Sequence, residues 1–390
     1  MGETETVRPS SDEEGQRRAE PEAQPDAGRL TGLAVTISKK TVPPQTRRDR
    51  PAPVSDTEWR DVLGAGWCDR CAGGVPGLPP PRPSCPGGGP EEDSPSDLPL
   101  FLSSSLPLRT RILPLPLSLL QAGYCLHPGF VVARGAGLRP LRFPALVALI
   151  DHPTAGPVLF DTGYAPRVLD ATHRLPYRVY RWLTPMHVGP EETVAAQLRA
   201  RGIAPEDMRH VVLSHFHADH TGGLFDFPNA TVHATAEAWD AVKSLTGARA
   251  VRSAVLPQLH PPDLSSRLAL LNQKNLRPLP AEWGIESDAY DVLGDGSLWG
   301  VPLPGHATGQ MGLLLQTPRG PVFLVADAVW LARTIHEGAD PHPLARAITP
   351  DPAGYRKTVD WLRSLARARP DVRLIPSHCT PSIAAWDADA

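Results

Sequence analysis

Short apolar runs bounded by polar residues dominate the chain from about residue 110 onward, and most of them are typical of buried strands. Helical periodicity is clearest after Asp351, where Pro352 can occupy the first turn and apolar residues recur on one face. The mixture indicates an α/β fold. We expect strands over 112–120, 130–134, 143–151, 157–160, 211–213, 231–235, 298–303, 312–316, 321–325 and 372–375, and helices over 190–201, 236–245, 264–271 and from 352 onward.

The first 108 residues lack such a pattern. Glu, Ser, Arg and Pro dominate the beginning, and residues 76–90 contain seven prolines and four glycines. A segment of this composition buries too little apolar surface to offset the entropy of ordering it. We therefore expect a disordered low-complexity extension over 1–108 and one folded domain over 109–390. The extension is either a regulatory tail or an over-extended gene start, and the sequence favours neither.

Composition narrows the class of protein. The net charge is −3, with no basic block, which argues against a nucleic-acid partner. No apolar run reaches the ~18 residues of a membrane span, and the polar first 30 residues show no signal peptide. The five cysteines suggest no disulfide framework. We expect a cytoplasmic protein whose partner is a small molecule, and the sequence does not indicate an oligomeric state.

The densest chemistry follows the predicted strand 211–213. Within six residues, the chain places three histidines and one aspartate. His215 and His217 can point the same way, because side chains in an extended segment alternate between faces. Asp219 and His220 follow directly, and two glycines then allow a sharp turn. Imidazole and carboxylate groups at this spacing predict two adjacent metal sites for Zn²⁺, with Fe or Mn as alternatives.

This run resembles the H-x-H-x-D-H signature of the metallo-β-lactamase superfamily, and four further segments match that family in order. They are the turns Phe160–Gly163 and Pro304–Gly309, the strand end Ala326–Asp327, and Ser377–His378. The resemblance covers residues 110–390 and implies a four-layer αββα sandwich with its site at one edge of two sheets. It implies His215, His217 and His306 as ligands of one ion, Asp219, His220 and His378 as ligands of the second, Asp327 as the bridge, and Asp161 as a residue beside the ligands.

The same resemblance implies an enzyme. Two Zn²⁺ ions would hold a bridging hydroxide that attacks a small ester, lactone or thioester, with Asp219 and Asp327 as catalytic residues. The order of motifs is most similar to that of quorum-quenching lactonase-like members. Many of those have a tyrosine three residues after the bridging aspartate, where this chain has Trp330.

Three alternatives stay open at this point. The first is a phosphodiesterase on the same binuclear site. The second is a mono-iron dioxygenase of the same fold, and the third is a scaffold that binds metal or a partner without turnover. We expect the walls around a substrate to come from residues 174–187 and 250–290, which offer Tyr, Trp, Leu and a few Arg.

Overall fold

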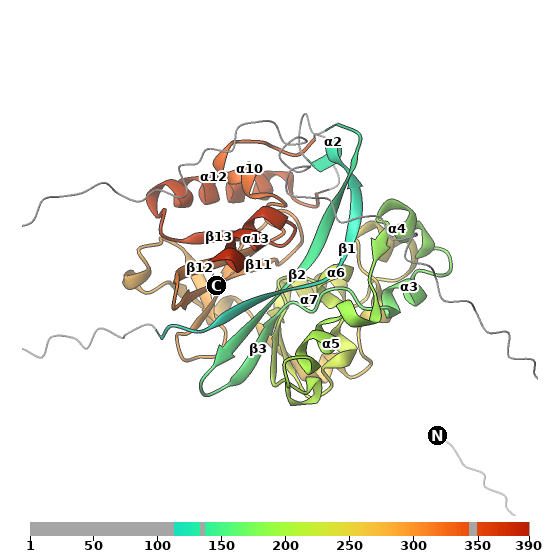
Figure 1. Cartoon of the computed structure of the whole chain (residues 1–390), viewed down its shortest axis with the longest axis horizontal. Coiled ribbons are helices and arrows are strands. Elements are labelled where there is room, and N and C mark those ends of the chain that lie inside the picture. Colours follow the sequence, from blue (N-terminus) through green and yellow to red (C-terminus); the bar gives the residue numbers. More distant parts are fainter. Residues whose placement is uncertain (1–112, 133–136, 343–348, 390) are drawn as a thin grey trace, which may run out of the picture. The chain divides into compact units, whose positions relative to one another are not determined.

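The computed structural model describes residues 113–132, 137–342 and 349–389, so the expected extension over 1–108 lies outside the described residues. Two β-sheets form the centre of the fold (Figure 1). The first has the order β4-β1-β2-β3-β5-β6-β7, with β1 (Leu117–Pro128), β2 (Pro140–His152), β3 (Gly156–Phe160), β4 (Met186–His187), β5 (His210–Val212), β6 (Thr231–Thr235) and β7 (Leu268–Leu271). The second has the order β13-β12-β11-β10-β9-β8, with β8 (Leu276–Pro278), β9 (Asp288–Asp291), β10 (Leu298–Pro302), β11 (Met311–Thr317), β12 (Gly320–Ala326) and β13 (Arg373–Pro376).

The two sheets pack face to face through alternate residues of their strands. In β3, Val158 and Phe160 belong to the core between the sheets, whereas Leu159 points to the opposite face. In β11, Leu313 joins the same central core and Leu314 points outward. A strand that is buried on both faces reads as a continuous apolar run, because each face has its own covering layer.

Helices cover the two outer faces. On the first sheet, α5 (Val194–Arg199), α7 (Ala236–Val242) and α9 (Leu264–Arg267) contribute buried residues to the outer core. On the second sheet, α12 (Pro352–Ala368) packs through Val359 and Leu362. Asp351 caps α12 by accepting hydrogen bonds from the N–H groups of Ala353 and Gly354. The order helix, sheet, sheet, helix confirms the expected αββα sandwich. No helix of the described ranges is long and apolar enough to cross a bilayer.

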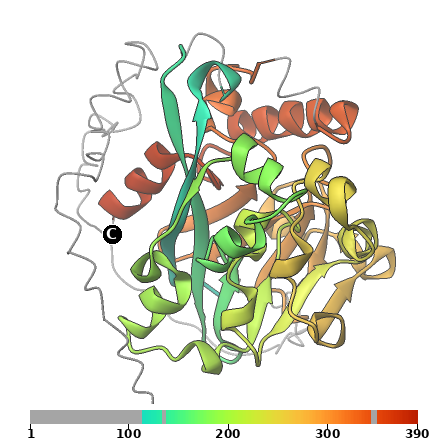
Figure 2. The ribbon, with the colours of Figure 1, turned by 90° about the vertical axis from the view of Figure 1, so that its right-hand side faces the viewer.

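The hairpin of β1 and β2 is the longest paired segment of the first sheet, and Figure 2 shows its two strands (teal) side by side. Its strands contain 12 and 13 residues, and the register shifts between Gln121 and Tyr124. Leu115 lies just before β1, is fully buried, and donates its backbone N–H to the carbonyl oxygen of Gln316 on β11. The hairpin of β1 and β2 therefore extends from the core between the two sheets to the site described below.

Several sequence-based boundaries were wrong. The strand expected over 130–134 is instead a helical turn, α2 (Gly129–Val132), as far as the described residues reach. Backbone N–H groups of Gly129 and Phe130 bond to the carbonyl oxygens of Arg139 and Gly137, which folds this segment back on the hairpin. The helix expected over 264–271 divides into α9 and the edge strand β7, and α13 (Thr380–Ala388) was not predicted.

Candidate metal centre

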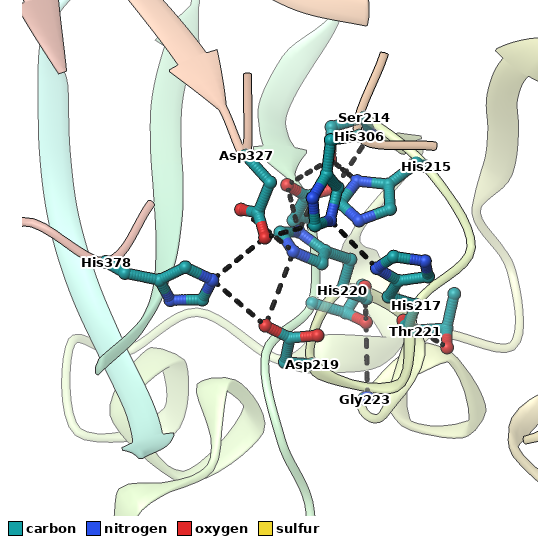
Figure 3. A network of polar contacts seen from close by, with 12 residues as sticks. Ser214, His215, His217, Asp219, His220, Thr221, Gly223, His306, Asp327 and His378 are labelled. Carbon is teal, nitrogen blue, oxygen red and sulfur yellow. Dashed lines mark hydrogen bonds and ion pairs between the residues drawn. The ribbon is translucent and has the colours of Figure 1, made fainter. Parts of the chain in front are cut away.

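All seven predicted ligands lie just beyond strand ends, at one edge of the two sheets. His215 and His217 follow β5, and Asp219 and His220 lie in the short helix α6 (Ala218–Thr221) that comes next. The other three follow β10, β12 and β13 and are His306, Asp327 and His378. Figure 3 shows their side chains pointing toward one another from these separate segments. The structure thus brings together residues that are up to 163 positions apart in the sequence, His215 and His378.

The first group consists of His215, His217 and His306, whose possible ligand atoms all lie within 4.8 Å of one another. Nε2 of His306 lies 3.0 Å from Nδ1 of His217. The rings of His215 and His217 meet edge to face, with centroids 4.4 Å apart. His217 and His306 are partly exposed, so this group is the more open of the two.

The second group consists of Asp219, His220, Asp327 and His378, which are all buried and also lie within 4.8 Å of one another. Nε2 of His378 is 2.9 Å from Oδ2 of Asp327 and 3.5 Å from Oδ2 of Asp219. Asp327 also faces the first group, because its Oδ2 is 3.3 Å from Nε2 of His306. Its carboxylate therefore lies between the two groups.

Outer hydrogen bonds fix the rings of the second group. Nδ1 of His220 lies 2.7 Å from Oδ2 of Asp161, and Nδ1 of His378 lies 2.8 Å from the carbonyl oxygen of Pro144. Asp161 also accepts hydrogen bonds of 2.8 Å from the backbone N–H and from the hydroxyl of Ser214. Each Nδ1 is thus engaged on the outside, which leaves Nε2 directed at the centre, as in histidines that bind metals.

The donor atoms at the centre fit metal ions. Among the described residues, Nε2 of His215, Nε2 of His220 and Oδ1 of Asp327 are buried without a hydrogen-bond partner. Buried polar atoms without partners are costly and rare, yet here three of them converge on one place. Nitrogen and oxygen donors in two groups of three and four suit two divalent ions of the zinc type.

The electrostatics of the two groups differ. Burial lowers the pKa of His215 and His217 well below the ordinary value, and the neighbouring histidines lower it further. Burial also opposes a charge on His220, but the carboxylates of Asp219, Asp161 and Asp327 outweigh it and raise the pKa of His220 well above that value. The pKa of His378 is raised in the same way by Asp327. Without metal, the histidines of the first group therefore favour the neutral form, and those of the second group favour the protonated form.

The residues around the two ligand groups were only partly predicted from the sequence. The expected walls contribute Tyr180 and Leu256, which pack in one apolar cluster with Ala218 of α6. Trp182, by contrast, is 62% exposed. Phe143, near the start of β2, was not predicted near the site. Its ring lies 5.4 Å from that of His378. The pairing of β1 with β2 and the contact of His378 with the carbonyl oxygen of Pro144 bring this part of the chain there, and neither has a local sequence signal.

The chain belongs to the metallo-β-lactamase superfamily: the model of that family matches residues 141–378. This match includes every residue of both ligand groups. The N-acyl homoserine lactonase AttM of Azorhizobium caulinodans is 32% identical over 184 residues, which are 46% of this chain and 59% of that relative. The chain thus spans less than two thirds of this relative. A lactonase of the same name from Agrobacterium fabrum is 29% identical over 233 residues, or 58% of this chain and 77% of the relative.

Solved structures show the same fold. A structure of an N-acyl homoserine lactone hydrolase, with the product N-hexanoyl-L-homoserine at its catalytic metal centre, covers 70% of this chain and 97% of its own. The TM-score is 0.54 and the sequence identity is 18%. The two chains therefore share the sandwich, while their side chains differ widely.

Proposed function

We propose that this chain is a binuclear metal-dependent hydrolase that opens lactones. The observation that carries the proposal is the position of Asp327, whose Oδ2 lies 2.9 Å from His378 of one group and 3.3 Å from His306 of the other. A carboxylate between two complete ligand groups suits a pair of ions that share one water molecule. Membership of the superfamily and the likeness to relatives named as lactonases support the same reaction.

The chain's own residues supply position and proton transfer. Two divalent cations, when bound, polarise the carbonyl group and acidify a water molecule. One ion would be held by His215, His217 and His306. The other would be held by Asp219, His220 and His378, and Asp327 would contact both ions. Asp219 lies at the edge of the second group, with Oδ2 3.4 Å from Nε2 of His220. In this place its carboxylate can accept the proton of the attacking water molecule and pass it to the oxygen that leaves when the ring opens.

The alternative reactions receive less support. A mono-iron dioxygenase needs only three ligands, and this chain keeps a second group of four buried ones. A scaffold without turnover has no need of both groups. A phosphodiesterase would hold an anion, whereas the side chains packed beside His378 and His306 are the uncharged Phe143 and Trp330. Zinc is the proposed metal, with iron or manganese as alternatives, and a cytoplasmic location stays a prediction from the sequence.

The test is a substrate panel with zinc-, manganese- and iron-loaded protein. We expect turnover of acyl-homoserine lactones, aliphatic lactones and aryl esters above that of bis-aryl phosphodiesters, with about two ions per chain by elemental analysis. His217→Ala is the blank, because it removes a ligand of the first group. Cleavage of phosphodiesters alone would replace the lactonase by the phosphodiesterase. One persistent iron per chain without hydrolysis would favour the dioxygenase.

Trp330→Tyr belongs in the same panel. The ring of Trp330 lies 6.3 Å from that of His306, beside the first group. An indole offers one N–H donor, whereas a phenol can both donate and accept. A rise in lactone turnover in this variant would indicate that Trp330 marks divergence from other lactonases within a shared site.

A further inference from the structure

One imidazole beside the metal centre has no polar partner. His127 is the last residue but one of β1 and is partly buried. Among the described residues, its ring makes no hydrogen bond and no ion pair. Its one ring contact is an edge-to-face arrangement with Phe143, with centroids 5.5 Å apart. An imidazole in such a place keeps both of its nitrogens available to a ligand.

Phe143 connects this imidazole to the metal centre. The Phe143 ring lies 5.4 Å from that of His378, a ligand of the second group, and 6.1 Å from that of Trp330. His127 and the ligand histidine thus both contact the Phe143 ring, and both His378 and Asp219 are near enough to His127 to act on its charge. This place beside the ligand groups suits a contact with the outer part of a bound molecule.

The charge of His127 restricts the kind of group it can bind. Burial, and after it the nearby His378, lower the pKa of His127 to about 4, although Asp219 acts in the opposite direction. The ring is thus neutral at pH 7, with one donor and one acceptor nitrogen. A neutral ring in this position pairs well with an amide or a similar uncharged group, and it offers no charge to attract a carboxylate or a phosphate.

We propose that His127 is a specificity-determining residue, which hydrogen-bonds a neutral polar group in the side arm of the lactone. The inference rests on the proposed function and adds a preference to it. Lactones whose arm carries an amide should be favoured over lactones with a plain alkyl arm of similar length. Phe143, between His127 and His378, would pack against the bonds that join the ring to the amide.

The test compares two substrates and two variants. The substrates are N-hexanoyl-homoserine lactone and a γ-lactone with an alkyl arm. His127→Phe keeps the ring contact with Phe143 and removes the polar nitrogens. The control is His336→Phe, since His336 is an exposed histidine at the end of α10 (Ala332–His336) and lies outside the expected walls around a substrate. We expect His127→Phe to lower kcat/KM about tenfold for the amide substrate, chiefly through KM, as for one lost hydrogen bond.

The alkyl lactone should be hydrolysed at the wild-type rate by both variants, and His336→Phe should behave as wild type with both substrates. Metal content should stay at two ions per chain throughout. His127→Gln, which keeps a donor and an acceptor, should restore part of the preference. If His127→Phe does not fold, His127→Leu, which also lacks the polar nitrogens, takes its place. Equal losses on both substrates, or an unchanged preference, overturn the inference alone. A wild-type protein that hydrolyses neither lactone overturns the proposed function, and this inference with it.

Discussion

At the scale of single residues, each histidine ring of the second group, proposed as a metal ligand, is held by its outer nitrogen. His220 and His378 both present Nε2 to the centre because Nδ1 meets Asp161 in one case and the Pro144 carbonyl oxygen in the other. Asp161 itself sits in a left-handed turn, at φ 65°, directly after β3. The turn therefore matters to the site although Asp161 is not among the ligands.

We predict that Asp161→Asn weakens metal binding about 10- to 100-fold, because the amide cannot hold His220 and Ser214 as the carboxylate does. Competition with a chelator measures this affinity. Asp295→Asn is the matched control, because Asp295 also accepts from the N–H and hydroxyl of a serine, Ser297, and faces His152 at 2.9 Å. Equal metal affinity in both variants would contradict the role of Asp161.

We also predict that metal binding releases protons at pH 7, and that the second group supplies them. The pKa values of His220 and His378 are raised in the metal-free protein, whereas those of His215 and His217 are lowered. A metal displaces the bound protons, so its affinity should increase as the pH rises. Calorimetry in buffers of different ionisation enthalpy counts the released protons. The release should persist in His217→Ala, and zero release from that variant would contradict the assignment.

The same shifts set the pH dependence of the metal-free protein. Raised pKa values of His220 and His378 stabilise the fold below the unfolded pKa of about 6.5, and this contribution is lost as the pH rises through the folded values. The lowered pKa values of His215 and His217 act in the opposite sense and destabilise the fold, but only below about pH 6.5. We therefore predict that the melting temperature of the metal-free protein falls above pH 6.5. An unchanged or rising melting temperature over pH 7 to 9 would refute this.

At the scale of elements, the turn between β10 and β11 depends on α12. The hydroxyl of Thr358 donates to the carbonyl oxygen of Pro304 at 2.7 Å. The backbone N–H of Asp351 donates to the carbonyl oxygen of Gly305 at 3.3 Å. Gly305 has φ +133°, and a Cβ at this residue would lie 2.4 Å from the backbone of Tyr355. His306 is thus positioned by direct backbone contact between the turn and the helix.

We predict that Gly305→Ala destabilises the fold by about 3 kcal/mol or more and weakens the first metal site, because the turn and α12 must separate. Gly294→Ala is the control: its φ is +82°, but no atom lies within 4 Å of the added Cβ. It should cost only the backbone strain, about 1–2 kcal/mol. Chemical denaturation and metal titration of both variants provide the comparison, and equal losses would show that the contact with Tyr355 is unimportant.

The sequence predicted elements best where the pattern and the boundary residues agree. The hairpin of β11 and β12 and the capped helix α12 are examples, since two continuous apolar runs with a turn between them and the Asp351-Pro352 pair are local signals. Residues 130–132 read as a strand because they are apolar, but hydrogen bonds across the hairpin hold them in a helical turn. Residues 268–271 became a strand by pairing with β6. Such tertiary contacts have no local signal, and for the same reason His127 was not foreseen beside the centre.

At the scale of the whole molecule, the described part contains its own core and both ligand groups. The core between the sheets begins with Leu115 and Leu117 and ends with Trp386 of α13. These residues lie far apart in the sequence, yet all are below 9% exposed. The folded unit therefore needs the chain from shortly before residue 115 onward, and the expected domain boundary at residue 109 stays a prediction.

We predict that a chain that begins at residue 105 folds, binds two ions and keeps the activity of the full-length protein. Its start precedes Leu115, whose side chain is fully buried and whose N–H bonds to the carbonyl oxygen of Gln316 at 2.8 Å. A chain that begins at residue 121 is the control. It lacks Leu115, Leu117 and Leu120, three buried side chains whose loss costs several kcal/mol together, so it should be insoluble or unfolded. The measurements are thermal melting, metal content and lactone turnover of the full-length protein and of the chains that begin at residues 105 and 121. Insoluble or inactive protein from residue 105, beside active full-length protein, would show that residues 1–104 take part in the fold or in the reaction.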